Sequence, residues 1–510
     1  MAETNNNYQR KVGVLLSYLS QAIHMLSSII YTPIMLRLLG QSEYGIYQLV
    51  YSTVSYLGLL SFGFSSAYMR FYSRFRAQKK DIEISKLNGM FLTIFTILAV
   101  ICLCCGFIML GNIELIFGDK LNALEYNTAR KLMILMVINL SLTFPDSVFN
   151  SIISSKEKFI FQKILLVLQN LLNPFITLPL LIMGYGSVAM VVVTTALTFG
   201  KFFSHVFYCL KKLKISFSFS NFDIYLLKEM WGFTFFIFIN MIVDQINWSV
   251  DKLLLGRISG TIAVAIYGVS AQLNSIYLQL SSSISGVFIP KVNKIVAESN
   301  DDHLLTDLFT KIGRIQFMLL SLVLTGFIIF GKPFIYIWAG EGYESSYFIA
   351  LLLMIPVTIP LIQNLGIDIQ RAKNMHKARS VVYLFIAICN IFLSIPLIKL
   401  YGGIGAAIGT AISLFVGNGI FINWYYHYRV GLNIKYFWTN IIKITPAIVI
   451  PCLFGILLNI VFYINTIIKL FVFIGLYSVI YCISIYFLAL NNDEKSLVNS
   501  VINKFINKCV

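Results

Sequence analysis

Charged residues are scarce in this 510-residue sequence. Only 12% of its residues are Asp, Glu, Lys or Arg, whereas ordinary soluble domains carry about 25%. Apolar residues make up 58%, and no polar stretch is long enough for a folded domain outside a membrane. This composition excludes an ordinary soluble multidomain protein and indicates a membrane protein.

Catalytic motifs are also missing. No Gly-rich phosphate loop ends in Gly-Lys-Ser/Thr, which argues against a built-in ATPase, and neither His-Glu-x-x-His nor Gly-x-Ser-x-Gly occurs. The spacing of the eight cysteines matches neither a zinc site nor a disulfide framework. We therefore expect no catalytic residues, no metal and no cofactor, with H⁺ or Na⁺ left as a coupling ion.

Apolar segments recur along the whole chain. A transmembrane helix needs about 20 mostly apolar residues. This criterion predicts fourteen spans, at about residues 12–36, 44–69, 87–110, 131–154, 159–183, 186–210, 229–255, 262–289, 312–337, 346–367, 379–400, 404–428, 441–463 and 467–490. The predicted fold class is an all-α polytopic membrane protein with about fourteen transmembrane helices.

The second half of the chain weakly repeats the first at an offset of 217 residues. Asn173–Leu180 resembles Asn390–Leu397, and Lys156 matches Lys373 at the same offset. Six spans separate each element from its copy, so both halves enter the membrane from the same side, a plan found in alternating-access transporters. We predict two pseudo-symmetric six-helix bundles, in residues 1–215 and 216–430, followed by two extra helices and a cytoplasmic tail in 431–510.

The basic residues predict the orientation. If the N-terminus is cytoplasmic, 29 of the 39 Lys and Arg residues fall on the cytoplasmic side, nine fall outside, and Lys201 lies within a span. This bias follows the positive-inside rule and accounts for the net charge of +17 without nucleic acid. Basic loops, such as the one that begins at Arg70, are expected to bind anionic membrane lipids.

Polar residues within the spans are the candidate site. Each ionisable group costs about 2.5–3.5 kcal/mol at the bilayer centre, so it should face protein or water. In span seven, polar residues recur at intervals of four, three and four residues, namely at Asn240, Asp244, Asn247 and Asp251. This spacing places them along one helical face. We predict a hydrated substrate-binding cavity between the halves, lined by spans one, two, seven and eight, with these candidates: Gln21, His24, Asn240, Asp244, Asn247, Asp251, Lys252, Gln272 and Gln279.

Structural roles remain open for several of these residues. Ser and Gln stripes such as that of span eight often mediate helix packing. Asp251 and Lys252 could form a plain interfacial pair, His24 could hydrogen-bond a neighbouring helix, and Asp244 could be a structural acceptor. Outside the candidate set, Lys201 and His205 lie close to the cytoplasmic end of span six, where snorkelling to the interface is the expectation.

Three glycine-containing stretches carry a family resemblance. They are Leu38–Tyr47, then Leu254–Gly256 followed by Ala265–Gly268, and finally Tyr401–Ala407. With the span count, they make the whole chain resemble the Wzx-type polysaccharide flippases of the multidrug/oligosaccharidyl-lipid/polysaccharide exporter superfamily. These motifs indicate the fold more than the substrate.

The resemblance implies flipping of undecaprenyl-diphosphate-linked oligosaccharide across the bacterial cytoplasmic (inner) membrane for capsule, lipopolysaccharide or exopolysaccharide synthesis. We expect a monomer with both termini cytoplasmic, partners among polysaccharide polymerases and glycosyltransferases, no nucleic acid, and a role for Arg70 in drawing in the diphosphate. Two other functions stay open. One is a cation-coupled exporter of small molecules or drugs, favoured by the intramembrane carboxylates. The other is a membrane glycosyltransferase or polymerase, with a weak acidic signal in the outer loop at about 111–130.

Overall fold

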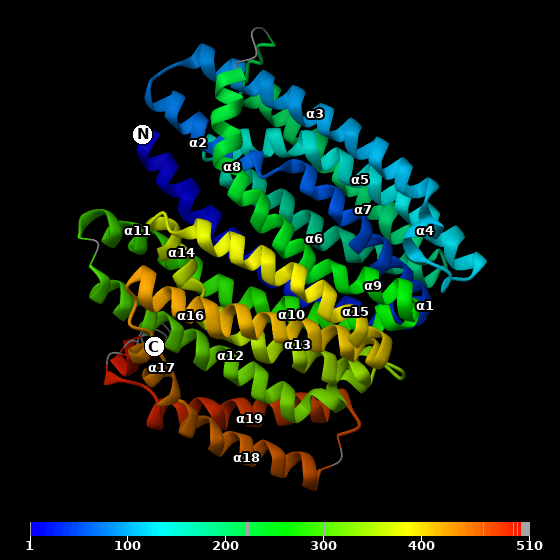
Figure 1. The fold of residues 1–510 in the computed structure, drawn as a ribbon, viewed down its shortest axis with the longest axis vertical. Coiled ribbons are helices and arrows are strands. Elements are labelled where there is room, and N and C mark those ends of the chain that lie inside the picture. Colours follow the sequence, from blue (N-terminus) through cyan, green and yellow to red (C-terminus); the bar gives the residue numbers. More distant parts are fainter. Residues whose placement is uncertain are drawn as a thin grey trace, which may run out of the picture. The chain divides into compact units, whose positions relative to one another are not determined.

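A computed structural model describes residues 2–219, 224–299, 301–462, 464–492, 494–496 and 498–500. Over these ranges the chain forms helices and no strands (Figure 1). The predicted all-α fold class is therefore confirmed.

Contacts divide the chain into two compact units. The first unit comprises Met1–Gly268 with Tyr383–Ala406, and the second comprises Val269–Val382 with Ala407–Val510. This division follows contacts rather than the repeat, so it does not test the predicted domains. The bundles at 1–215 and 216–430 and the appendage at 431–510 remain predictions.

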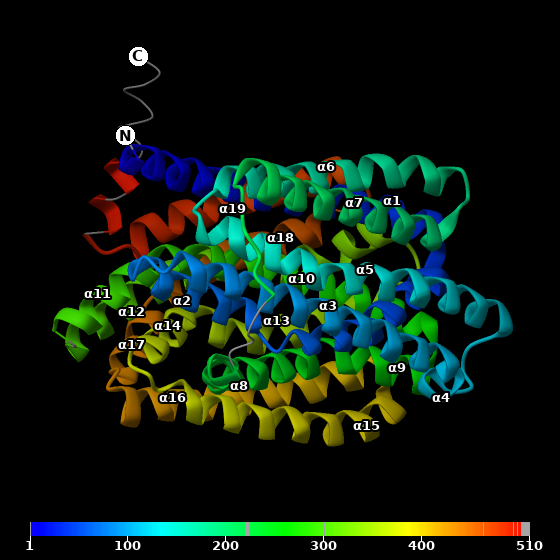
Figure 2. The same cartoon turned by 90° about the horizontal axis from the view of Figure 1, so that it is seen from above.

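The first unit is built from long helices with short helical connections. Their bounds are α1 Ala2–Ser55, η1 Tyr56–Ser61, α2 Phe64–Ala77, α3 Asp81–Gly111, α4 Ile113–Phe117, α5 Ala123–Ser155, α6 Phe159–Ile182, α7 Gly186–Phe207, η2 Tyr208–Lys212, α8 Ile224–Gln245, η3 Ile246–Val250 and α9 Asp251–Ser259. Helix α1 packs against α6, and α5 packs against both α3 and α7 (Figure 2).

The second unit contains the later helices, and two long helices are shared between the units. The shared helices are α10 Thr261–Ser285 and α15 His376–Leu414. The others are η4 Gly286–Phe288, α11 Ile289–Glu298, α12 Asp302–Ala339, α13 Ser345–Ile362, α14 Asn364–Ala372, η5 Phe415–Phe421, α16 Ile422–Tyr425, η6 Tyr426–Val430, α17 Ile434–Ile442, α18 Thr445–Val461 and α19 Ile467–Leu488.

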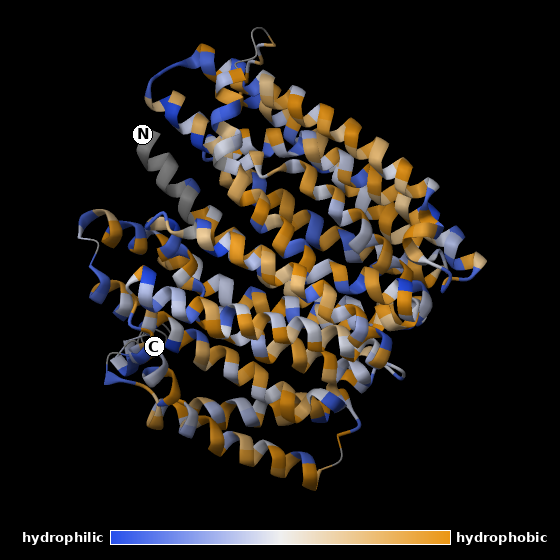
Figure 3. Cartoon of the chain, viewed as in Figure 1, coloured by the Kyte–Doolittle hydropathy of each residue, from blue (hydrophilic) through white to orange (hydrophobic). Residues whose placement is uncertain are grey.

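Eleven helices in the described ranges are long and apolar enough to cross a membrane, or twelve if the bent segment Ile224–Ser259 counts as one span. Apolar residues cover most of the length of these helices (Figure 3). Two of the eleven, Val12–Ala77 and Lys377–Val430, each contain two predicted spans. The chain is a multi-pass membrane protein, while the count of fourteen spans stays a prediction.

Glycine breaks each of these two long helices. Gly40 interrupts α1 with φ 73° and ψ 172°, and Gly402 interrupts α15 with φ 55° and ψ −130°. A positive φ with an extended ψ is accessible almost only to glycine. These breaks lie where the sequence predicts the reversals between spans one and two and between spans eleven and twelve.

The 217-residue repeat is visible in the backbone. Helices α5 and α14 end at Ser155 and Ala372, and the following helices begin at Phe159 and His376, both pairs at the predicted offset. In each connection one residue is left-handed: Glu157 has φ 57° and Asn374 has φ 62°.

The repeat also preserves a side-chain hydrogen bond. The Thr177 hydroxyl donates to Asn173 Oδ1 at 3.3 Å, and the Ser394 hydroxyl donates to Asn390 Oδ1 at 3.1 Å. Both hydroxyl-bearing residues are buried. A weak sequence match thus corresponds to the same local structure in the two halves.

One end of the first unit gathers the predicted outer connections. Glu43 Oε1 accepts from the backbone N–H and the hydroxyl of Ser187 at the start of α7, at 2.6 and 2.8 Å. Glu125 Oε1 accepts from the hydroxyls of Ser42 and Thr261 at 2.6 and 2.8 Å. Two carboxylates therefore join the connections after spans one, three, five and seven.

The opposite end of this unit holds the predicted cytoplasmic connections, which follow spans two, four and six. Arg74 forms an ion pair with Glu229 at 3.0 Å, and Arg76 donates to the Ser155 carbonyl at 3.2 Å. The Asn88 amide donates to the Ser216 carbonyl at 3.0 Å. This separation of odd and even connections is what a chain that crosses repeatedly between two faces requires.

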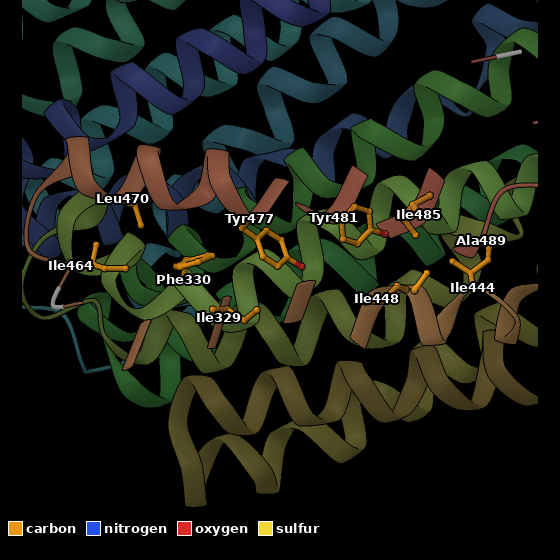
Figure 4. Close-up of a cluster of buried hydrophobic side chains, with 11 residues drawn as sticks. Ile329, Phe330, Ile444, Ile448, Ile464, Leu470, Tyr477, Tyr481, Ile485 and Ala489 are labelled. Carbon is orange, nitrogen blue, oxygen red and sulfur yellow. The ribbon is translucent and has the colours of Figure 1, made fainter. Parts of the chain in front are cut away.

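The last two long helices pack against α12 through a mostly apolar cluster (Figure 4). Ile329 and Phe330 of α12 meet Ile448 of α18 and Tyr477 and Tyr481 of α19. The two phenols hydrogen-bond to α12, since the Tyr481 hydroxyl donates to the Met318 carbonyl at 2.8 Å and that of Tyr477 lies 2.6 Å from Thr325 Oγ1. No phenol in this cluster is left without a hydrogen bond, as an apolar environment demands.

A buried ion pair closes the same helix group at its other end. Arg314 of α12 donates to both carboxylate oxygens of Glu494, each at 2.9 Å, to the Asn440 carbonyl at 2.9 Å and to the Ala489 carbonyl at 2.7 Å. Burial opposes ionisation of Glu494, but hydrogen bonds from Arg314 and the Asn491 backbone lower its pKa overall. The pair joins α12, α17 and the chain beyond α19.

We expect Glu494→Ala to destabilise the second unit by roughly 3–5 kcal/mol, because Arg314 would keep a buried charge without its partner. Thermal unfolding of the purified protein measures this loss, with Glu298→Ala as the control because Glu298 is exposed. Since the folded pKa of Glu494 is depressed, its stabilising effect should be complete above its ordinary value of 4.5 and be lost at lower pH. An unchanged melting temperature for Glu494→Ala would contradict this account.

Candidate functional site

Two glycines allow α1 to approach α9 and the start of α10 closely. A Cβ atom added at Gly45 would lie 2.0 Å from the Thr261 carbonyl oxygen, and one added at Gly256 would lie 2.5 Å from a methyl group of Leu49. Both glycines belong to the stretches that carry the family resemblance. Their absent side chains bring the polar residues of these helices within hydrogen-bond distance of one another.

A cluster of five polar side chains occupies this contact. Lys252 Nζ donates to Gln48 Oε1 at 2.9 Å, and Gln48 Nε2 donates to the Tyr44 hydroxyl at 2.8 Å. The Tyr267 hydroxyl donates to Asp251 Oδ2 at 2.5 Å. Tyr44, Asp251 and Tyr267 are buried, whereas Gln48 and Lys252 are half-buried. We call these five residues the polar cluster.

The predicted polar face of span seven changes direction before the polar cluster. Residues Ile246–Val250 form a π-helical turn between α8 and α9. A π turn contains more residues than an α turn, so side chains beyond it are rotated relative to those before it. Accordingly, Asp244 is exposed, while Asp251 is only 1% exposed. Such turns are frequent at functional sites.

The other predicted residues are distributed over both units. In the first unit, Asn240 donates to the Phe236 carbonyl of its own helix at 2.8 Å, Asn247 and Gln21 are half-buried, and His24 and Arg70 are exposed. In the second unit, Gln272 and Gln279 are half-buried, and the Gln279 amide lies 3.5 Å from the Ser275 hydroxyl. Their common lining of one cavity stays a prediction.

A second ionisable cluster lies between α5 and α7. His205 Nδ1 lies 2.7 Å from Asp146 Oδ1, and Lys201 Nζ lies 3.4 Å from Asp146 Oδ2. Asp146 and His205 are buried, so the expectation that His205 reaches the interface is wrong: the imidazole binds a carboxylate inside the bundle instead. Phe161 packs against the imidazole ring.

Sequence reasoning missed Gln48 and Asp146. Asp146 is the one acidic residue of predicted span four, and the rule applied to Asp244 would have selected it. Gln48 follows Tyr44 by four residues, a spacing that places both on one helical face. Its link to Lys252 joins residues 204 positions apart and leaves no local signal.

The long apolar helices, the glycine breaks and the internal polar clusters together define a polytopic membrane protein. The family described as polysaccharide biosynthesis protein matches residues 11–296, more than half of the sequence, so the chain belongs to that family. The resemblance to Wzx-type flippases is thereby confirmed. A comparison with curated proteins found no match.

Solved structures show the same fold. A lipid II flippase, MurJ, in an inward closed conformation is 17% identical, with a TM-score of 0.71 over 93% of this chain and 97% of its own. An inward-facing multidrug resistance transporter of the MATE family is 13% identical, with a TM-score of 0.65 over 82% and 96%. The bent form of the Vibrio cholerae MATE transporter VcmN is 13% identical, with a TM-score of 0.54 over 81% and 96%. At these identities the similarity is one of fold.

We expect Gly45→Ala to destabilise the first unit by about 1–3 kcal/mol, because the new methyl group would meet the Thr261 backbone. Gly200→Ala is the matched control, since a Cβ there meets nothing within 4 Å. The melting temperatures of the two purified variants provide the measurement. Equal values would show that α1 does not depend on close contact at Gly45.

Proposed function

We propose that this protein flips undecaprenyl-diphosphate-linked oligosaccharide repeat units from the inner to the outer leaflet of the cytoplasmic membrane, for assembly of a surface polysaccharide. The observation that carries the proposal is the match of residues 11–296 to the polysaccharide biosynthesis family. The similarity in fold to a lipid II flippase supports it, because that protein is itself a flippase.

The chemistry of the candidate residues suits such a substrate. A diphosphate and several sugars do not cross hydrocarbon unaided, because each unpartnered polar group costs several kcal/mol there. The substrate crosses by alternating access through a central polar cavity. In that cavity, amides and hydroxyls replace water around the sugars. The half-buried ammonium of Lys252 supplies a cation for the diphosphate, and the exposed carboxylate of Asp244 accepts hydrogen bonds from sugar hydroxyls.

Orientation and partners complete the proposal. In this proposal both termini face the cytoplasm. The basic residues Arg74 and Arg76 support it, because they lie at the end of the first unit that holds the connections after spans two, four and six. Anionic lipids bind the basic loops, Arg70 helps to draw in the diphosphate, and the protein acts as a monomer beside glycosyltransferases and a polysaccharide polymerase.

We expect Asp244→Asn to slow flipping about tenfold or more, because a hydrogen bond to a charged group is worth roughly 1.5–3 kcal/mol. The assay uses proteoliposomes with a fluorescent undecaprenyl-diphosphate oligosaccharide and an impermeant quencher. Asp119→Asn is the control, since Asp119 is an exposed loop carboxylate. Absence of flipping by the unaltered protein would refute the function, whereas normal flipping by Asp244→Asn would refute only the role of that carboxylate.

The runner-up function is a cation-coupled exporter of small molecules. The group formed by Asp146, His205 and Lys201 favours it, because three ionisable side chains in contact inside a helix bundle can bind a transported proton or cation. Intramembrane clusters of this kind often mark proton or ion pathways.

A proton gradient discriminates between the two functions. As a flippase of lipid-linked sugars, the protein should not move cationic dyes in proteoliposomes when a gradient of about one pH unit is imposed. Gradient-driven dye efflux that is lost in Asp146→Asn and retained in Asp119→Asn would establish the exporter instead. The measurement needs no lipid-linked sugar, so it is independent of the flipping assay.

A further inference from the structure

A polar cavity of about 260 Å³ lies in the second unit, apart from the residues proposed to contact the substrate. One face of α12 contributes Asp307, Lys311 and Arg314, and α17 contributes Tyr436 and Asn440. The remaining wall is the chain beyond α19, with Glu494. This volume is slightly below the roughly 300–1,000 Å³ of pockets that hold drug-sized ligands, so it suits a small polar group.

Arg314 is not available to a ligand in this cavity. Its guanidinium already donates to the carboxylate of Glu494 and to the carbonyls of Asn440 and Ala489. Because the pair is buried and electrically neutral, it forms a wall of the cavity without attracting an anion or a cation strongly. Recognition must come from the other lining residues.

Apart from the Arg314–Glu494 pair, the lining residues provide one cation, one anion, two hydroxyls and two amides. Asp307 and Lys311 are exposed, and neither forms an ion pair or a hydrogen bond with the rest of the described chain, although their spacing of four residues would allow them to pair. Thr310 lies between them and is 4% exposed, and its hydroxyl has no hydrogen-bond partner within the described ranges. With two acidic and two basic side chains, the cavity has no net formal charge.

The cavity lies near the N-terminal ends of two helices that are long and apolar enough to span a membrane, which is where lipid headgroups are expected. Both α12 and α17 begin apolar segments long enough to span a membrane, Asp302–Ala339 and Ile434–Val461, and the lining residues occupy the first turns of these segments. Tyr436 is exposed there, and tyrosine is enriched at membrane–water interfaces. The abundant ligand at this depth that carries one cation and one anion is a zwitterionic phospholipid.

We propose that this cavity binds the headgroup of a zwitterionic phospholipid, an ammonium–phosphate group such as phosphoethanolamine. The ammonium lies against Asp307, and the phosphate accepts hydrogen bonds from Lys311 and Thr310. The acyl chains remain in the bilayer, since the cavity has room for the headgroup alone. An anionic headgroup fits less well, because it would meet the carboxylate of Asp307 without a compensating ammonium. The inference is independent of the proposed flippase function.

The test uses the full-length protein, purified in detergent and stripped of lipid, and titrated with dioctanoyl phosphatidylethanolamine under native mass spectrometry. We expect one saturable site, with binding about tenfold weaker in Asp307→Asn and in Lys311→Gln, because each variant removes one charged hydrogen bond. Lys294→Gln is the matched control, since Lys294 is exposed on α11 and does not line the cavity. Melting temperatures confirm that the variants are folded.

Two further ligands identify the source of the headgroup chemistry. Dioctanoyl phosphatidylglycerol should bind more weakly than the ethanolamine lipid, and Asp307→Asn should reduce that difference. Soluble phosphoethanolamine should bind much more weakly than the lipid, because it lacks the acyl chains that remain in the detergent. Equal affinity for the soluble compound would overturn the assignment to a lipid, and equal affinity of the unaltered protein and both cavity variants would overturn the site itself.

Discussion

The hydrogen-bonding demand of the backbone inside a membrane is the constraint on which this structure depends. A span has no water to bind an unpaired N–H or C=O group, so each helix must continue until the chain leaves the hydrocarbon or finds another partner. Reversals are therefore confined to a few positions, and Gly40 and Gly402 take conformations that other residues rarely adopt. Near the first break, Glu43 accepts a hydrogen bond from the backbone N–H of Ser187 at the start of α7. A side chain thus pairs a backbone donor that has no acceptor within its own helix.

This constraint explains why the repeat survives at a connection and at buried polar positions, while it is weak at the lipid-facing positions of the spans. A lipid-facing position accepts almost any apolar residue, so similarity there is lost without cost. The connection around Glu157 and its counterpart around Asn374 must instead hold one residue in a left-handed conformation. The buried hydroxyl of Thr177 and that of Ser394 likewise retain the same asparagine acceptor four residues earlier. At the connection the backbone conformation is kept although the residues differ, whereas within the spans the sequence match follows the hydrogen bond to asparagine.

The same distinction sets how much the sequence can predict. Helical spans, their reversals at glycines and the alternation of connections follow from local composition, and the structure agrees with them. The candidate site is harder, because its contacts join distant helices. Lys252 was selected from its own span, yet its partner Gln48 lies 204 residues earlier. The π-helical turn before Asp251 cannot be predicted from a helical period of 3.6 residues. Because of this turn, Asp244 and Asp251 lie in different environments, although their spacing alone places them on one helical face.

A polar side chain that is already saturated by its own protein is a poor ligand for a substrate, and this principle divides the ionisable residues into two groups. Glu125, Asp146 and Arg314 each hold two or more helices together through short contacts, and moving them toward a substrate would leave partners without hydrogen bonds. Lys252 differs, because it is half-buried and donates one hydrogen bond, to the amide oxygen of Gln48. We therefore propose that Lys252, next to the π-helical turn of span seven, can exchange its partner for a substrate group without separating the helices that Glu125, Asp146 and Arg314 hold together.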